Sequence, residues 1–329
     1  MGYRTIPQLL LDAAARDSDR PWLHSDDVEL TFAQAAAAVG GRATVLAEHG
    51  IKAGDLVVLT ARTTPSYLLT WLAITSMGAV VVSTNPASTS VELAGLLIQT
   101  RPRAIVTDAE IRPLIDAGPA TVLDVDEVAG PPAEVPGGAA KPDDLAALIP
   151  TSGTTGRSKL VMQTHRAYVM AGEGFPFWME LHPDDRLMTS LPLFHINAPA
   201  YSVLGSLACG AGLVLLPRFS ASGFLDAARR YGATEFNAIG AMLEILMRQP
   251  ERPDDADNPL RLCYTGPAPD QERHREIERR FGLRIVCGYA MSETPYGLIW
   301  PHGTRPYGTL GTVRQHPTLG TVNEARVVD

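Results

Sequence analysis

The sequence of 329 residues predicts an α/β protein with two mostly parallel sheets, each flanked by helices, followed by the start of a small β subdomain. Short apolar strand patterns alternate with helical patterns through most of the chain, which is typical of βαβ units. A stretch rich in proline and glycine, residues 127–145, interrupts this alternation and indicates a linker between two subdomains. We therefore expect a first subdomain over residues 1–140, a second over 141–305, and a β subdomain that begins at 306.

The first half of the chain begins with a helical pattern, because Ile6, Leu9, Leu10 and Ala13 recur at helical spacing. Thr31 is a candidate N-cap for the next helix. Helices and strands are then expected in alternation, with helices over 32–48, 65–77 and 91–100 and strands at 57–59, 79–83 and 104–106.

The alternation resumes after the linker. Strands are expected at 187–191, 213–216, 261–264 and 284–287, and helices near 199–209, 222–231, 240–248 and 270–281. From about residue 308 the pattern changes again, because Gly308, Gly311 and Gly320 separate short β-like pieces. This change indicates an unfinished β subdomain at the C-terminal end.

Composition excludes several classes of protein. A formal net charge of −8 argues against non-specific binding to nucleic acid, which requires basic surfaces. Cys209, Cys263 and Cys287 lie far apart without CxxC spacing, so neither a disulfide framework nor a zinc site is expected. No apolar stretch approaches the ~20 residues that span a membrane. We expect a cytoplasmic protein with no nucleic-acid or membrane partner.

The strongest local signal is the segment Thr151-Ser152-Gly153-Thr154-Thr155-Gly156-Arg157-Ser158-Lys159, directly after the apolar run 145–149. Glycines let backbone amides converge on an anion, and the hydroxyls and the ammonium group add donors for a polyphosphate. The chain has lysines only at positions 52, 141 and 159, which makes a lysine here informative. The spacing differs from a Walker A loop. An ordinary Ser/Thr/Gly turn is the alternative interpretation.

At this loop the chain resembles the adenylate-forming superfamily of acyl-CoA synthetases, luciferases and peptide-synthetase adenylation domains. The family loop reads Thr/Ser-Ser-Gly-Thr-Thr-Gly-x-Pro-Lys-Gly, and this chain departs from it at Ser158 and Leu160. Leu191-Pro192-Leu193-Phe194-His195 resembles the second family signature. Gly288-Tyr289-Ala290-Met291-Ser292-Glu293 resembles the family segment Tyr-Gly-x-Thr-Glu.

Residues 5–108 resemble the family's opening, and with two weaker matches the resemblance covers essentially the whole chain. Tyr264-Thr265-Gly266-Pro267-Ala268-Pro269 stands where the family has its Gly-Gly-Ala-Pro turn, and Gly308-Thr309-Leu310-Gly311 resembles the start of the family's β subdomain. The general look is closest to bacterial acid–CoA ligases of the crotonobetaine/carnitine–CoA ligase type. The resemblance implies two sheets layered αβαβα, with the active site in the cleft between the subdomains.

The resemblance also implies the activity. A small acid is activated by ATP as its adenylate, pyrophosphate is released, and CoA then takes the acyl group as a co-substrate. The phosphates would be held by Thr151, Ser152, Gly153, Thr154, Thr155, Gly156 and Lys159, and Mg²⁺ by Glu293. Tyr289 would stack on adenine and Ser292 would contact the α-phosphate. The remaining nucleotide contacts would be Gly266, Pro267, Ala268, Gly288 and Ala290. The residues expected to be catalytic are Thr154, Lys159, His195 and Glu293.

The acid pocket is expected to be lined by His195, Asn197, Asn237, Gly240, Ala241, Gly266 and Met291. Several of these have a simpler alternative. His195 could be a hydrogen-bonded core histidine, the asparagines could be turn or cap residues, and Gly240 and Ala241 could mark a close helix–strand contact. The aromatic residues Phe175, Phe177 and Trp178 are expected in the core rather than at a ligand.

Some family features are missing. Family members carry a lysine on a small C-terminal domain and an aspartate in a Thr-Gly-Asp segment, but this chain has no lysine after 159 and no Thr-Gly-Asp after 293. We therefore expect a piece of a longer enzyme that is poorly active alone. One alternative is an adenylating enzyme that serves an amine or a carrier protein, or that activates nitrite for diazotisation. Another is a non-catalytic nucleotide-binding scaffold, which the departures at Ser158, Leu160 and Ala290 favour and Lys159 and Glu293 oppose.

Overall fold

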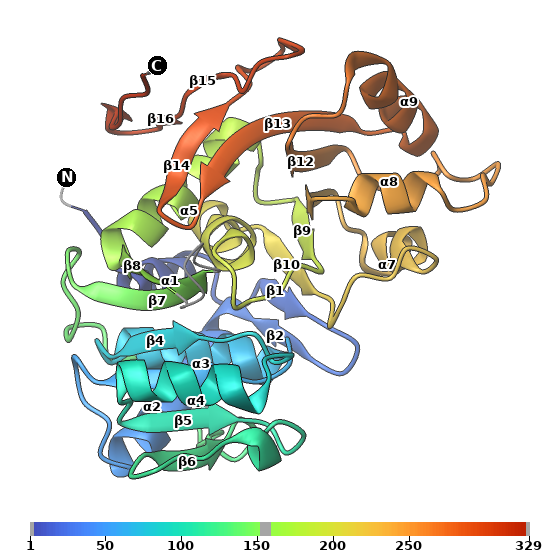
Figure 1. The fold of residues 1–329 in the computed structure, drawn as a ribbon. Coiled ribbons are helices and arrows are strands. Elements are labelled where there is room, and N and C mark those ends of the chain that lie inside the picture. The colour runs from blue at the N-terminus through green and yellow to red at the C-terminus, as the bar shows by residue number, and fades with distance from the viewer. Residues whose placement is uncertain (1–2, 152–158, 327–329) are drawn as a thin grey trace. The chain divides into compact units, whose positions relative to one another are not determined.

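The computed structural model describes residues 3–151 and 159–326, and its contacts divide the chain into two compact units (Figure 1). The first unit comprises Met1–Leu23, Val28–Val169 and Pro192–Ile196, and the second comprises His24–Asp27, Met170–Leu191 and Asn197–Asp329. Each unit is built around a mostly parallel sheet with helices packed against it, so the predicted α/β class is confirmed.

The sheet of the first unit has the strand order β6-β5-β3-β4-β7-β8, parallel except for β8. Its strands are β3 (Leu56–Thr60), β4 (Val80–Ser83), β5 (Ala104–Thr107), β6 (Thr121–Asp124), β7 (Leu145–Thr151) and β8 (Lys159–Thr164). The other elements of this half are α1 (Ile6–Arg16), β1 (Pro21–His24), β2 (Glu29–Thr31), α2 (Phe32–Glu48), α3 (Pro65–Ser76), α4 (Ser90–Thr100) and the short η1 (Arg112–Leu114).

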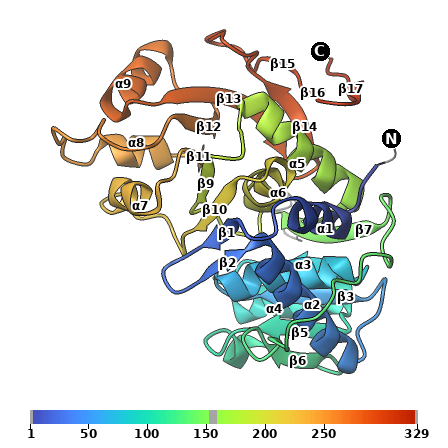
Figure 2. The same cartoon turned by 180° about the vertical axis from the view of Figure 1, so that it is seen from behind.

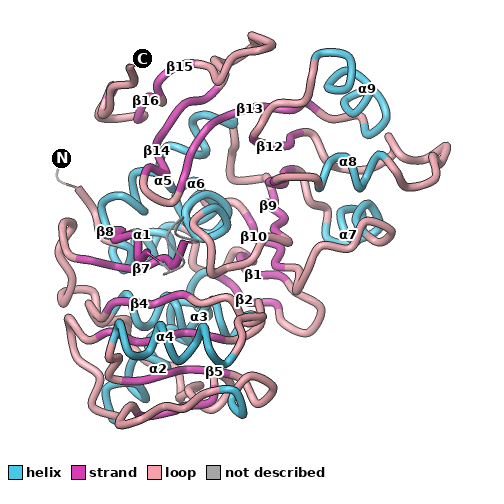
Figure 3. The backbone as a smooth tube through the Cα atoms, in the orientation of Figure 1, coloured by secondary structure: helices cyan, strands magenta, loops and turns pink. Residues whose placement is uncertain are grey.

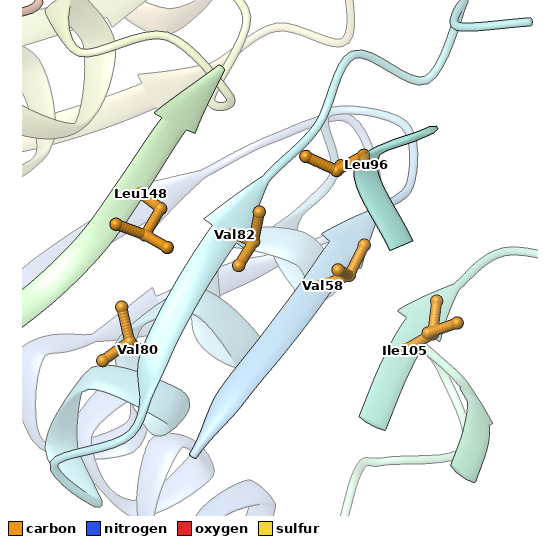
Figure 4. Packing of buried hydrophobic residues seen from close by; sticks show 6 residues of the cluster. All are labelled: Val58, Val80, Val82, Leu96, Ile105 and Leu148. Atoms are coloured by element: carbon orange, nitrogen blue, oxygen red, sulfur yellow. The ribbon is translucent and has the colours of Figure 1, made fainter. Parts of the chain in front are cut away.

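The core of the first unit forms because its strands are apolar on both faces, as parallel strands covered by helices must be. On one face, Leu96 of α4 packs against alternate strand residues, which Figure 4 shows as Val58, Val80, Val82, Ile105 and Leu148. On the other face α3 contacts β3 and β4, and α2 packs against α3.

Capping explains where several helices of this unit begin. Thr31 caps α2 as predicted, since its hydroxyl accepts from the Gln34 amide and the Gln34 side chain accepts from the Thr31 amide. The same reciprocal pair occurs at Thr5 for α1 and at Thr89 for α4. Each such cap contributes about 1 kcal/mol to helix stability.

The strands of the second unit run in the order β15-β14-β13-β12-β11-β9-β10. They are parallel from β10 to β13 and antiparallel at β14 and β15. Figure 3 shows the strands in magenta and the helices in cyan. Their bounds are β9 (Arg186–Thr189), β10 (Gly212–Leu215), β11 (Glu235–Ile239), β12 (Leu262–Gly266), β13 (Arg284–Met291), β14 (Thr294–Ile299) and β15 (Thr312–Val313). A separate small hairpin follows, formed by β16 (Gln315–His316) and β17 (Gly320–Thr321).

Helices cover both faces of this second sheet (Figure 2). On one face lie α7 (Phe224–Tyr231), α8 (Met242–Met247) and α9 (Gln271–Phe281), and the Phe224 ring of α7 packs on Phe236 of β11. On the other face lie α5 (His165–Met179), the π-helix η2 (Ala198–Val203) and α6 (Leu204–Cys209). Phe175 and Trp178 are buried here as expected, while Phe177 is 44% exposed.

The predicted linker differs from expectation. We expected the second subdomain to begin at residue 141, whereas β7 and β8 complete the sheet of the first unit because β7 pairs with β4. The linker itself packs along α2. The amide of Ala133 donates to Ala37, and a Cβ on Gly40 would lie 2.1 Å from the Ala133 carbonyl oxygen. None of the helices in the described ranges is long and apolar enough to cross a membrane.

Candidate active site

Neighbouring strands of the second unit bring several predicted site residues to one edge of the sheet. Ile239 of β11 pairs with Gly266 of β12, and Thr265 pairs with Cys287 of β13. Because these strands are parallel, the segments that follow them emerge side by side at the carboxyl edge, where open α/β sheets bind ligands. These segments are Gly240–Ala241, Gly266–Ala268 and Gly288–Glu293.

The backbones at Gly266 and Gly288 approach each other closely in this edge. A Cβ on Gly266 would lie 2.5 Å from the Gly288 carbonyl oxygen. A Cβ on Gly288 would lie 2.9 Å from both the Tyr264 ring and the Leu298 carbonyl oxygen. Only glycine therefore fits at either position without moving a strand. Pro267, which follows a cis peptide bond, is exposed, and Ala268 is half-buried.

The Gly288–Glu293 segment forms the end of a β hairpin. Met291 pairs with Thr294, so Ser292 and Glu293 are the two residues of the turn between β13 and β14. Tyr289 is 38% exposed and Met291 is 41% exposed. The Glu293 side chain is exposed and makes no hydrogen bond or ion pair with the residues that the structure describes. An accessible carboxylate of this kind is a suitable ligand for Mg²⁺.

Asn237 and Asn197 are joined by a hydrogen bond. Asn237 lies within β11 and is 1% exposed, and its Nδ2 donates to Asn197 Oδ1 at 2.7 Å and to Ser202 Oγ at 3.4 Å. Asn237 Oδ1 is buried without a partner among the described residues. A turn role for Asn237 is therefore wrong. Asn197 precedes η2, yet its side chain accepts from Asn237 instead of capping that helix.

Gly240 and Ala241 are both exposed and directly follow β11. A Cβ on Gly240 would meet no atom within 4 Å among the described residues. The close helix–strand contact considered for these small residues is therefore wrong for Gly240. The space beside Gly240 instead fits the expectation that this position leaves room for a bound molecule.

The two ends of the predicted phosphate loop lie in the first unit. Thr151 ends β7 and pairs with Lys159, the first residue of β8. The Thr151 hydroxyl donates to the Lys159 carbonyl oxygen at 3.5 Å, and the Lys159 side chain is exposed. The predicted phosphate contacts Ser152, Gly153, Thr154, Thr155 and Gly156 lie outside the described residues.

His195 belongs to the segment Pro192–Ile196 of the first unit. Its side chain is exposed, its ring centroid lies 4.4 Å from that of Phe194, and its ring makes no hydrogen bond within the described ranges. The alternative of a hydrogen-bonded core histidine is therefore wrong. Partial desolvation of the ring by surrounding protein atoms lowers the pKa of His195 below its ordinary value. This shift favours a neutral imidazole at pH 7, even though the side chain remains accessible.

No metal-binding group of three or more His, Cys, Asp or Glu side chains occurs in residues 3–151 and 159–326. Cys263 and Cys287 are buried, and burial raises the pKa of both thiols, to about 12 for Cys287. Neither thiol is therefore a reactive nucleophile at neutral pH. Glu293 is the metal-ligand candidate that the sequence predicted and that the hairpin leaves accessible.

Sequence reasoning missed the buried residues that support this edge of the sheet. Arg314, which follows β15, is fully buried and bonds to Tyr201 and Tyr264. In the sequence Arg314 is only a charged residue within a short β-like piece, and no motif includes it. Its partners lie 113 and 50 residues away in the chain, so no local pattern could pair them.

Comparisons with known proteins agree with this geometry. A family model described as AMP-binding enzyme matches residues 10–329. The crotonobetaine/carnitine–CoA ligase of Salmonella agona (strain SL483) is 28% identical over 359 aligned residues, which cover 100% of this chain and 68% of that protein.

Two solved structures extend the agreement to the fold. The inhibitor-bound N-terminal domain of FACL13 from Mycobacterium tuberculosis superposes with a TM-score of 0.85 at 25% identity, covering 94% of this chain and 82% of that chain. ATP-bound MatB from Rhodopseudomonas palustris superposes with a TM-score of 0.84 at 26% identity, covering 96% of this chain and 67% of that chain. The chain therefore belongs to the AMP-binding enzyme family, the adenylate-forming ligases that activate acids with ATP.

Proposed function

We propose that this chain activates a small acid with ATP as its acyl adenylate, releases pyrophosphate, and prepares the acyl group for transfer to CoA. The observation that carries the proposal is the carboxyl edge of the second unit's sheet. There the Gly266–Ala268 turn and the Gly288–Glu293 hairpin lie on adjacent strands, with an exposed aromatic ring, a hydroxyl and a carboxylate. Membership of the AMP-binding enzyme family supports the same reaction.

The nucleotide would bind across these two segments. Glycine at positions 266 and 288 lets the two segments pack closely against each other, and the exposed Tyr289 ring offers a face for stacking on adenine. Ser292 and Glu293 would then face the α-phosphate and its Mg²⁺. Mg²⁺ would supply charge neutralisation on the phosphate oxygens, since it binds one or two carboxylates together with phosphates and water.

The reaction needs positioning more than covalent chemistry from the protein. A carboxylate oxygen of the acid attacks the α-phosphorus of ATP, and the bond from that phosphorus to the pyrophosphate oxygen breaks. Lys159, together with Thr151–Gly156, would bind the β- and γ-phosphates and stabilise the leaving pyrophosphate. In the second step the CoA sulfur would attack the acyl carbon and AMP would leave.

The acid would bind near Asn197, Asn237, Gly240, Ala241 and Met291, and His195 remains a proposed pocket residue. The two amide side chains make one side of this region polar, and Gly240 leaves it open. A short polar acid fits such a region better than a long alkyl chain does. The Salmonella relative is named for crotonobetaine and carnitine, so betaine-like acids are the first to test.

Acid-dependent exchange between ATP and radiolabelled pyrophosphate tests the first step, with short aliphatic, betaine-like and aromatic acids. Exchange with one acid class and formation of its CoA thioester are expected. Exchange without thioester formation would indicate that an amine or a carrier protein, and not CoA, accepts the acyl group in the second step. Exchange with nitrite but with no carboxylic acid would indicate that the activated substrate is nitrite and not a carboxylic acid.

Two variants test the residues named for the first step. Lys159→Ala and Glu293→Ala are each expected to lower exchange by about 10²-fold, because each removes a charge that would contact the phosphates or their metal. Lys52→Ala is the matched control, since Lys52 is an exposed lysine outside the predicted site. Unchanged exchange in both test variants would support the non-catalytic scaffold instead.

A further inference from the structure

Arg314 is a fully buried cation in the second unit. Its guanidinium donates from Nε to the Leu298 carbonyl oxygen at 3.1 Å, and from Nη1 to the Tyr201 hydroxyl at 2.9 Å and the Pro295 carbonyl oxygen at 3.2 Å. Nη2 donates to the Tyr264 hydroxyl. The guanidinium carbon also lies 4.3 Å from the centroid of the Trp178 ring, within cation–π distance.

This cation has no carboxylate partner in the described part of the chain. Removing a charge from water is costly, so a buried guanidinium must be satisfied by other acceptors. Phenol oxygens, carbonyl oxygens and aromatic faces do so here, and all of them are fixed in direction. A shift of the strands that carry these groups would therefore leave part of the buried guanidinium without acceptors.

The strands that Arg314 joins are not neighbours. Leu298 and Pro295 belong to β14, whereas Tyr264 belongs to β12, and β13 lies between these two strands in the sheet. Arg314 thus bridges across β13 and fixes the relative position of three strands. The Tyr201 hydroxyl reinforces the bridge, because it also donates to the Pro295 carbonyl oxygen at 2.6 Å.

The bridge ends close to both halves of the candidate nucleotide site. Pro295 is two residues beyond Glu293 in the hairpin, and Tyr264 is two residues before Gly266. The Tyr264 ring also packs directly on Gly288, where a Cβ would lie 2.9 Å from the ring and from its hydroxyl oxygen. A movement of Tyr264 would therefore be transmitted to Gly288 and to the backbone beside Gly266.

We propose that Arg314 is a positioning residue that, through Tyr264 and Pro295, holds the Gly266–Ala268 turn and the Gly288–Glu293 hairpin at the separation that the nucleotide requires. This inference rests on the proposed function, because it assumes that these two segments bind ATP. It predicts that the bridge affects nucleotide affinity more than it affects the acid or the chemical step.

Tyr264→Phe is the sharpest test, because it removes the oxygen that Arg314 binds and keeps the ring on Gly288. Tyr296→Phe is the matched control, since Tyr296 packs on the same Trp178 ring but its buried hydroxyl has no partner in the described residues. We expect Tyr264→Phe to raise the Kd for ATP with Mg²⁺, measured calorimetrically, by about tenfold. The KM for ATP in pyrophosphate exchange should rise similarly, with kcat and the KM for the acid within about twofold. Tyr296→Phe should change none of these.

Arg314→Lys and Arg314→Met complete the design. Lysine keeps the charge but cannot satisfy the same set of acceptors, so Arg314→Lys should recover only part of the affinity that Arg314→Met loses. Adding Tyr264→Phe to Arg314→Met should cause no further loss, because the two side chains act through one bridge.

The outcomes separate this inference from the proposed function. A wild-type protein that binds no ATP overturns both. A wild type that binds ATP, with Tyr264→Phe binding equally well, overturns the positioning role and leaves the proposed function intact. Equal loss of affinity in Tyr264→Phe and Tyr296→Phe also overturns it, since a general weakening of the aromatic core would explain that result. If Arg314→Met does not fold, the Tyr264→Phe comparison still decides.

Discussion

Glu235 offers a quantitative test of the interior of the second unit. It begins β11, is fully buried, and neither carboxyl oxygen has a hydrogen-bond partner among the described residues. Burial raises the pKa of this carboxyl well above its ordinary value of 4.5, and the nearby carboxylate of Asp185 raises it further, while Arg261 opposes the shift. Asp185 itself is held as an anion by Arg261, whose Nη2 lies 2.5 Å from Asp185 Oδ2.

The raised pKa makes stability depend on pH in a defined direction. Below pH 4.5 the Glu235 carboxyl is protonated in both the folded and the unfolded chain, so its contribution to the free energy of unfolding is fully present. Above 4.5 the unfolded chain releases the proton while the folded chain keeps it. The free energy of unfolding therefore falls by about 1.4 kcal/mol for each pH unit until the folded pKa is reached.

Glu235→Gln removes this dependence, because an amide of the same shape does not ionise. Urea unfolding followed by circular dichroism at pH 5, 6 and 7 measures it. The stability of the variant relative to wild type should increase with pH, by at most about 1.4 kcal/mol per unit, whatever the absolute difference at pH 5. Glu272→Gln, an exposed glutamate at the start of α9, is the control and should show no such trend. A difference between Glu235→Gln and wild type that is constant with pH would refute the reasoning.

Three further changes have defined outcomes. Burial lowers the pKa of His165 from 6.5 to about 4, so the free energy of unfolding of wild type should fall by roughly 3 kcal/mol as the pH falls through that range. In urea titrations, His165→Gln should flatten this dependence of the free energy of unfolding on pH. Gly266→Ala should abolish ATP binding in calorimetry, because its Cβ would lie 2.5 Å from the Gly288 carbonyl oxygen; retained affinity would contradict the packing. Gly95 lies on the exposed side of α4, and no atom of the described residues lies within 4 Å of an added Cβ. Gly95→Ala should therefore raise stability by about 0.5–1 kcal/mol in thermal unfolding, and a lower Tm would contradict this.

Much of the fold could be predicted because the signals are local. Thr31 and the helix after it, the buried strands of the first sheet, and the order of the family motifs all follow from residues close together in the sequence. Helix α5 was not predicted, because glycines and Pro176 inside it imitate loop composition. Strand β11 was also missed, because Glu235 and Asn237 interrupt its apolar pattern although both are buried.

In the candidate site, too, the local features could be predicted and those that depend on distant residues could not. The segment Gly288–Glu293 was found from its motif, but its form as a hairpin turn was not, because no expected strand covered β14. The adjacency of Gly266 and Gly288 depends on strand order, which single-sequence patterns do not encode. Arg314 lies furthest from sequence reasoning, since its role depends entirely on groups from α5, η2, β12 and β14.

The glycine pair in α2 has a consequence for the local unfolding of the first unit. Gly40 and Gly41 each weaken the helix interior by about 0.5–1 kcal/mol, yet they are what allows the backbone at Pro131 and Ala133 to lie against it. The helix and the segment across it therefore depend on each other, and a fluctuation that lifts the segment exposes the weakest turn of the helix. In hydrogen exchange the two would behave as one cooperative unit. The part of residues 127–145 that packs on Gly40 and Gly41 has the composition of a flexible linker, yet it contributes to the stability of α2. Shortening it would therefore destabilise α2.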